Sequence, residues 1–251
     1  MKKHKWLIRP SQMGKLMKKG RAKDKIFGDT AIKVIEEAVL LHKFGQEPEE
    51  VEDKKLDKGI FNEAQNIDLA SKVLKWNIVS SKAPKRRLIN DYFTGEPDIN
   101  TPDLLADIKS SWNSGTFPWF RNPMNEDYKA QLHCYMDLTG KDEAELVYCL
   151  SNHPEHIYKA EIKRLTYYYS ERPHLFPEAE GIDELWTLAE EKAEEKVKKS
   201  GIFDHIPEAN RVKRFIIKKD PEYMAKIHER VIQARELFDE LYNKLEENGS
   251  N

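Results

Sequence analysis

The feature that most constrains the fold is a change in hydrophobic pattern near residue 75. Before it, apolar residues recur at helical spacing over about residues 30–44 and again over about 55–74. Between residues 76 and 112, short runs rich in β-branched and aromatic residues alternate with turn-forming segments, which predicts three strands joined by hairpins. The three predicted strands are WNIVSS, RLINDYFTGEPDI and LLADIKSSW.

The rest of the chain continues to mix helices with strands. A helix is predicted over about residues 126–139, and a fourth strand over 145–152. An amphipathic helix over 181–199 and a late strand over 211–219 follow. From Pro221 a seven-residue apolar repeat predicts a long final helix that packs against another helix. We therefore expect an α/β (α+β) fold in which helices flank a central mixed sheet.

The composition excludes several classes of protein. The 251 residues are 39% hydrophobic, which supports a buried core. No stretch approaches the roughly 20 apolar residues that cross a bilayer, and the N-terminus has no apolar run of secretory-signal length. We therefore expect a cytoplasmic protein without a membrane partner. The two cysteines, Cys134 and Cys149, are too few for a four-cysteine zinc or iron–sulfur site and are expected in the core.

The charges are distributed unevenly, although the net charge is only −2. Residues 1–25 carry ten Lys and Arg but a single acid, Asp24, and a second basic run extends from Lys82 to Arg87. Basic runs of this kind favour contact with a polyanion, or they form a solvated and partly mobile terminus. The charge pattern alone leaves both interpretations open.

The stretch GEPDINTPDLLADIKSSW, residues 95–112, carries the most specific chemistry. In a strand, Asp107 and Lys109 project from one face while Ile108 points to the other. Asp98 lies just before the predicted turn, and eight residues separate it from Asp107, so a hairpin brings the two carboxylates together. Close carboxylates repel each other unless a cation lies between them, and hard oxygen ligands select Mg²⁺ or Mn²⁺. Such an ion polarises a phosphoryl oxygen and lowers the pKa of a bound water.

This stretch resembles the PD-(D/E)XK motif of metal-dependent nucleases, with Pro97-Asp98 followed by Asp107-Ile108-Lys109. The run QLHCY, from Gln131 to Tyr135, resembles the QxxxY motif of the RecB-like branch of that superfamily. The resemblance covers about residues 55–152 and is closest to the lambda-exonuclease and YqaJ-like phage recombination exonucleases.

The resemblance implies a restriction-endonuclease-like core over residues 1–160, including a basic N-terminal segment, and a mostly helical extension over 161–251 packed on that core. It also implies roles for individual residues. The metal would be held by Glu63, Asp98, Asp107 and the backbone carbonyl of Ile108, and Lys109 would be the catalytic lysine, assisted by Gln131. Nucleic acid would be contacted by Arg9, Ser11, Tyr128, Gln131 and Tyr135.

The activity implied by the resemblance is a Mg²⁺-dependent DNA exonuclease, with Mn²⁺ as an alternative metal, that hydrolyses phosphodiester bonds at duplex ends in phage-type recombination. Its partners would be DNA and a single-strand annealing protein, and assembly into a homo-oligomer is left open. A phage-encoded protein would act in the host cytoplasm. Two alternatives also stay open: a RecB-like single-strand or structure-selective nuclease, and a catalytically silent DNA-binding or assembly protein.

Two further groups of residues have less specific signals. His153 and His156 lack a third nearby ligand, so we expect surface histidines rather than a metal pair. Aromatic residues surround the loop that follows the motif strand, where they either pack or stack on bases. They are Trp112, Phe117, Trp119 and Phe120.

Overall fold

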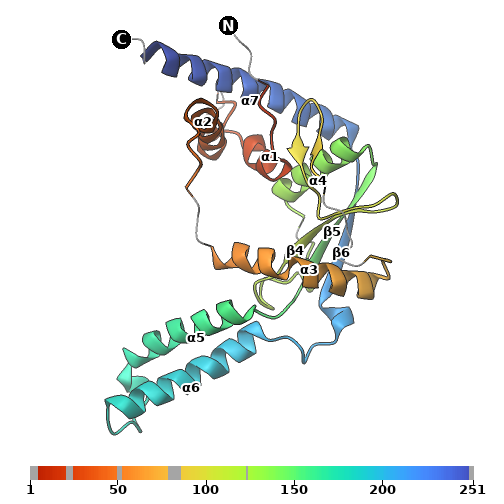
Figure 1. Cartoon of the computed structure of the whole chain (residues 1–251). Helices are drawn as coiled ribbons and strands as arrows, with labels where there is room; N and C mark the ends of the chain where they lie inside the picture. The colour runs from red at the N-terminus through yellow and green to blue at the C-terminus, as the bar shows by residue number, and fades with distance from the viewer. Residues whose placement is uncertain (1–4, 21–24, 50–52, 79–85, 123, 249–251) are drawn as a thin grey trace.

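A mixed four-stranded sheet lies at the centre of the molecule (Figure 1). The computed structural model describes residues 5–20, 25–49, 53–78, 86–122 and 124–248. β4 and β5 are parallel, whereas the two edge strands, β3 and β6, are antiparallel to their neighbours. In spatial order the strands are β3 (Ile99–Asn100), β4 (Leu105–Ser110), β5 (Glu143–Cys149) and β6 (Val212–Lys218).

Helices cover both faces of this sheet. Alternate residues of β5 point to opposite sides, as the two-residue period of a strand requires. Leu146 joins the core cluster beneath α4 (Glu126–Thr139), whereas Val147 packs with Ala70 of α3 (Lys54–Leu74). The side chains of α4 are buried without interruption from Ala130 to Met136, because a second helical layer covers its far side.

That second layer is formed by α1 (Pro10–Met17), α2 (Asp29–Phe44) and α7 (Pro221–Asn248). α2 ends at Gly45, which adopts the left-handed conformation typical of a residue that terminates a helix. The apolar repeat of α7 packs on α1 and α2, so the sequence prediction that the last helix contacts other helices is confirmed. The buried residues of this repeat are Met224, Ile227, Val231, Ala234 and Phe238.

The N-terminal segment is not a solvated terminus over residues 5–20. Trp6, Ile8, Met13 and Leu16 are buried in the core shared with α7. The backbone N–H of Ile8 also donates to the carbonyl of Tyr92 at 3.1 Å. The apolar side chains point inward while the basic ones remain on the outside, so the interpretation as a solvated and partly mobile terminus does not hold for residues 5–20. The other basic residues of this prediction, in 1–4, 21–24 and 82–85, lie outside the described residues.

The predicted strands before β4 differ from the observed ones. Residues 76–78 form no strand, and 79–81 lie outside the described residues. The segment predicted as one strand forms a small hairpin, β1 (Leu88–Ile89) and β2 (Thr94–Gly95), and then β3. The cause is Asn90, whose side-chain oxygen accepts hydrogen bonds from the backbone N–H groups of the second and third residues after it and so stabilises a turn.

Between β5 and β6 the chain forms a hairpin of two helices, α5 (Glu155–Ser170) and α6 (Ile182–Gly201), which extends away from the sheet (Figure 1). Short 3₁₀ turns over Pro173–Leu175 and Glu208–Asn210 follow α5 and α6 respectively. The expected division at residue 160 falls inside α5, and β6, which follows that division, completes the central sheet. None of the described helices is long and apolar enough to cross a membrane.

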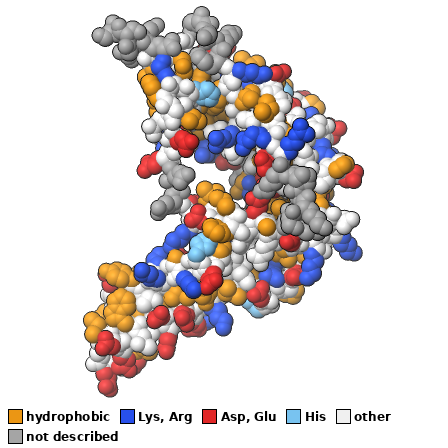
Figure 2. Space-filling view, viewed as in Figure 1, with side chains coloured by type: hydrophobic (Ala, Val, Ile, Leu, Met, Phe, Trp, Pro, Cys, Tyr) orange, Lys and Arg blue, Asp and Glu red, His pale blue; other side chains and the backbone are white. Residues whose placement is uncertain are grey.

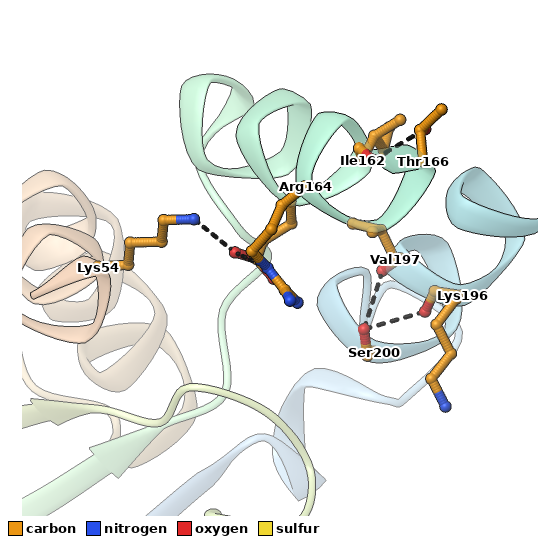
Figure 3. Close-up of polar contacts among 8 residues, drawn as sticks. Lys54, Ile162, Arg164, Thr166, Lys196, Val197 and Ser200 are labelled. Atoms are coloured by element: carbon orange, nitrogen blue, oxygen red, sulfur yellow. Dashed lines mark hydrogen bonds and ion pairs between the residues drawn. The ribbon is translucent and has the colours of Figure 1, made fainter. Parts of the chain in front are cut away.

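An ion-pair cluster joins this helical hairpin to α3. The ammonium group of Lys54 in α3 lies 2.7 Å from the Glu161 carboxylate of α5, and Arg164 binds the same carboxylate at 2.8 Å (Figure 3). Glu161 is only 15% exposed, so water screens these contacts less than those of a fully exposed pair. The N-terminal turn of α3 is therefore connected to the base of the projecting hairpin.

The close packing of α1 on α4 depends on Gly14. A Cβ atom added to Gly14 would lie 2.4 Å from the Cα of Asp127, so backbone would have to move. We expect Gly14→Ala to lower the free energy of unfolding by about 1–3 kcal/mol, measured by urea denaturation, although alanine favours helices. The matched control is Gly59→Ala in α3, where the added Cβ meets no atom within 4 Å and should stabilise by about 0.5–1 kcal/mol. A Gly14→Ala variant as stable as the wild type would contradict this packing.

Candidate active site

The β3–β4 hairpin brings the buried carboxylate of Asp107 and the half-buried one of Asp98 together beside a lysine. Asp98 precedes β3, and its Oδ2 atom accepts a hydrogen bond from the backbone N–H of Ile108 at 2.6 Å. Asp107 is 3% exposed, and its Oδ2 atom lies 2.7 Å from the Nζ atom of Lys109. Ile108 points to the opposite face, where it packs beneath α3. The structure therefore places these side chains as the alternation of residues along a strand predicted.

Helix α4 supplies the other side of the site. The side-chain amide of Gln131 donates to Oδ1 of Asp107 at 3.1 Å, and its oxygen accepts from Nζ of Lys109 at 3.3 Å. The Lys109 ammonium also lies 5.0 Å from the centre of the Tyr128 ring, within cation–π range. The hydroxyl of Tyr135 donates to the carbonyl of Glu96 at 3.3 Å, which fixes the chain just before Asp98. α4 thus orients both charged groups of β4.

The burial of like charges controls the electrostatics of the site. Burial and, after it, the neighbouring Asp107 charge together raise the pKa of Asp98 to about 7, against the opposing effects of the Ile108 N–H and Lys109. Burial by itself would lower the pKa of Lys109, but the nearby Asp107 and Asp98 carboxylates raise it above its ordinary value. The lysine is therefore held as a cation, and the site favours additional positive charge.

The predicted residues converge on one cavity of about 700 Å³. Glu63 lines this cavity from α3 on the opposite side from α4, and its charge contributes to the raised pKa of Asp98. Arg9 and Ser11, by contrast, are exposed and do not line it. The predicted residues that line the cavity are Glu63, Asp98, Asp107, Ile108, Lys109, Tyr128, Gln131 and Tyr135.

The start of α1 nevertheless lies close to the site. A Cβ atom on Gly95 would lie 2.7 Å from Cδ of Pro10 and 3.2 Å from a ring carbon of Tyr135, so these three residues pack together. Arg9 lines a separate cavity of about 340 Å³, together with Arg87. Figure 2 shows Lys and Arg side chains along the edge of the upper part of the molecule that faces a hollow above α3.

The aromatic residues after β4 have different environments. Phe117 is a core residue with 2% exposure, whereas Phe120 is fully exposed. Trp112 lines the cavity and packs on His153, with ring centroids 4.3 Å apart. His153 is 7% exposed, and burial and the nearby Lys58 lower its pKa to about 4. The prediction of a surface histidine is therefore wrong for His153, because α6 and the Trp112 ring cover it, whereas His156 is exposed.

Several residues of the site region were not singled out from the sequence, among them Tyr148, Asn125 and Lys58. Tyr148 and Asn125 line the cavity: Tyr148 lies opposite Lys109 in the parallel β4–β5 register, and Asn125 caps α4. Lys58 is 1% exposed on α3, behind the loop that follows β4. The available signal for Lys58 was that Lys58, Asn62 and Asn66 follow one another at intervals of four residues and so form a polar row on the inward face of the helix.

The oxygen ligands around the cavity fit a hard divalent cation. Within the described ranges, no group of three or more His, Cys, Asp and Glu side chains is arranged as a complete metal site. Mg²⁺ does not require such a group, because it usually keeps several waters and binds through one or two carboxylates together with substrate phosphates. Asp98 and Asp107 provide two such carboxylates, and burial and the repulsion between them raise the pKa of Asp98.

No protein-family model and no curated protein sequence matches the chain. Solved structures match it over nearly its whole length. A phage-related exonuclease from Haemophilus somnus 129PT is 26% identical, with a TM-score of 0.68 and coverage of 96% of this chain and 97% of that one. The alkaline exonuclease LHK-Exo from Laribacter hongkongensis is 12% identical, with a TM-score of 0.59 and coverage of 97% and 93%. LHK-Exo in complex with dAMP matches with a TM-score of 0.54.

The chain has the fold of these exonucleases. The match extends through α5, α6, β6 and α7, so the segment after residue 160 belongs to the shared architecture. The mixed α/β class with a central mixed sheet, flanking helices and a C-terminal helix is thereby confirmed.

The buried Lys58 makes the stability of the fold depend on pH. Burial lowers its pKa from 10.5 to about 7, so between these values the unfolded chain binds a proton that the folded chain does not. We expect the free energy of unfolding of the wild type, minus that of Lys58→Met, to rise from about pH 7 to about pH 9. Urea denaturation at a series of pH values measures this difference.

The matched control is Lys55→Met, which removes an exposed lysine from the same helix. A wild-type minus Lys58→Met difference that does not change with pH, or that changes no more than the Lys55→Met difference, would contradict the assignment of a desolvated ammonium to Lys58.

Proposed function

We propose that this protein is a metal-dependent DNA exonuclease that hydrolyses phosphodiester bonds at duplex ends. The observation that carries the proposal is the convergence of Asp98, Asp107, Lys109 and Gln131 on one cavity. The likeness to a phage-related exonuclease, 26% identical over 96% of this chain, supports the nuclease class. The dAMP complex of LHK-Exo supports a nucleotide as the kind of ligand.

The chemistry follows from the groups in the cavity. Asp98, Asp107, Glu63 and the carbonyl of Ile108 would hold Mg²⁺ or Mn²⁺. When bound, the ion would polarise a phosphoryl oxygen and lower the pKa of a coordinated water. Lys109 acts as a cation that stabilises negative charge on the phosphate and orients the attacking water, because the adjacent carboxylates keep its ammonium protonated.

The remaining residues orient these groups. Gln131 contacts both Asp107 and Lys109, so it fixes the separation of the carboxylate from the ammonium. Tyr128 limits the movement of Lys109 from one side, and Tyr135 stabilises the chain before Asp98. Arg9 and Ser11, at the start of α1, are proposed to contact the DNA phosphate outside the cavity. The Lys and Arg side chains facing the hollow suit a polyanion (Figure 2).

The biological process, the protein partner and the cellular location are proposed from this activity. Digestion of one strand from a duplex end leaves the single strand that a strand-annealing protein binds, so recombination of the phage type is the proposed process and such a protein the proposed partner. This activity would take place in the cytoplasm, which is the host cytoplasm for a phage-encoded chain. A homo-oligomer is compatible with this function.

Removal of the charge of Asp107 or of Lys109 should abolish cleavage. We expect Asp107→Asn and Lys109→Met to reduce the rate at which end-labelled linear duplex is digested by at least about 100-fold. The matched control is Asp103→Asn, an exposed acid in the β3–β4 turn, which should keep the wild-type rate. Closed circular DNA should remain intact, and the label released first identifies the polarity.

Other outcomes of this assay select the alternatives. Faster digestion of single-stranded or flap DNA than of duplex would replace the duplex-end proposal with a RecB-like specificity. Salt-dependent binding without cleavage by the folded wild-type protein would favour a catalytically silent DNA-binding protein.

Removal of divalent cations should stop the reaction. We expect EDTA to abolish cleavage and added Mg²⁺ or Mn²⁺ to restore it. Electron paramagnetic resonance of Mn²⁺ should detect binding without DNA, and Asp98→Asn should weaken that binding by about tenfold or more, because it removes a negative ligand. Asp103→Asn again serves as the control. Full activity in EDTA would exclude the metal-dependent mechanism.

A further inference from the structure

Lys58 is the most deeply buried charged side chain of α3. It is 1% exposed, and its Nζ atom donates to the carbonyls of Ser111 at 2.8 Å and Trp112 at 3.0 Å. Within the part of the chain that the structure describes, no carboxylate forms an ion pair with it. Burying an ammonium group without a counter-ion costs considerable free energy, and the lowering of its pKa to about 7 by burial reflects this cost.

The two carbonyls that accept from Lys58 belong to the loop that directly follows β4. The backbone N–H of Ser111 donates to the carbonyl of Cys149 at 2.8 Å, which continues the pairing with β5. Trp112 lines the cavity next to it. Lys58 therefore connects α3, through hydrogen bonds, to the end of the strand that carries Asp107 and Lys109.

Asn62, one turn further along α3, makes the equivalent attachment to β5. Its side-chain amide donates to Oγ of Ser151 at 2.9 Å and to the carbonyl of Asn152 at 2.7 Å. α3 is thus hydrogen-bonded to the C-terminal ends of both parallel strands through two buried side chains. The next residue, Glu63, faces the cavity.

These contacts determine where Glu63 lies relative to the carboxylates on the hairpin. A hydrogen bond weakens steeply when its length or angle changes, so these contacts restrict the position of α3 over the strand ends. A methionine or leucine would fill the volume of Lys58 without the cost of desolvation. The amino group of Lys58 differs from such side chains by its two directed hydrogen bonds.

We propose that Lys58 is a positioning residue of the active site, which holds α3 against the loop after β4 and so sets the distance between Glu63 and Asp107. Lys58 does not touch the substrate or the cation. The proposal rests on the function proposed above, because the distance matters only if Glu63 and Asp107 act on the same ion.

The test compares metal binding and kinetics of Lys58→Met with those of the wild type. Methionine keeps the length of the side chain and removes its donors. We expect the affinity for Mn²⁺, measured by electron paramagnetic resonance without DNA, to fall roughly 10- to 100-fold. The kcat for linear duplex should fall by a similar factor, whereas the KM for DNA should change by less than about twofold, because Lys58 does not contact DNA.

The matched control is Ser71→Ala at the other end of α3. Ser71 is also buried, and its hydroxyl group hydrogen-bonds to the backbone of Trp76 and Ile78 away from the cavity. This variant should lower the melting temperature and leave Mn²⁺ affinity and kcat unchanged. All variants are compared well below their melting temperatures, where far-ultraviolet circular dichroism shows them folded.

Lys58→Gln makes the test independent of whether Lys58→Met folds. Its amide keeps a donor on a shorter side chain, so an intermediate loss of Mn²⁺ affinity is expected. Wild-type Mn²⁺ affinity and kcat in either folded variant would overturn the proposal, as would an equal loss in Ser71→Ala. If the wild type itself neither binds Mn²⁺ nor cleaves DNA, the proposed function fails. If it does both and the Lys58 variants match it, only the positioning role fails.

Discussion

The structure is organised around two neighbouring carboxylates, of which Asp107 is buried and Asp98 half-buried. Placing Asp98 and Asp107 together shields them from much of the water and makes each repel the other, which is why the pKa of Asp98 rises to about 7. The surrounding groups offset this cost. The N–H of Ile108, the ammonium of Lys109 and the amide of Gln131 each direct a donor at one of the two carboxylates.

Helices α4 and α3, on opposite faces of the sheet, both position groups around Asp98 and Asp107. α4 reaches it directly, through Gln131, from the face on which Asp107 and Lys109 project. α3 lies on the opposite face and contributes at the strand ends, where its attachment through Lys58 and Asn62 places Glu63 at the cavity. Gln131 on α4 and Lys58 and Asn62 on α3 are buried polar residues, and their hydrogen bonds restrict the geometry more than apolar contacts do.

Local patterns predicted much of the site. The two-residue period of β4 placed Asp107 with Lys109, and the helical spacing of Gln131 and Tyr135 placed them on one side of α4, because each period follows from the geometry of its own element. Long-range pairings were not predictable in this way. β6 was expected as a strand, but its pairing with β5 was not predicted. Lys58 forms its contacts with residues more than fifty positions away. The burial of Trp6 and Met13 was missed because the charges around them dominated the prediction.

The helical hairpin of α5 and α6 also affects the order in which the sheet can form. β5 and β6 are neighbours in the sheet, yet the whole hairpin separates them in sequence, so their pairing closes a long loop. The backbone N–H of His153 donates to the carbonyl of Gly201 at 2.8 Å, which joins the two ends of the hairpin at its base. Once the two helices associate through local contacts, the remaining loop between the strands is short. During synthesis from the N-terminus, β3, β4, β5 and α4 can therefore assemble first, and the edge strand β6 joins them last.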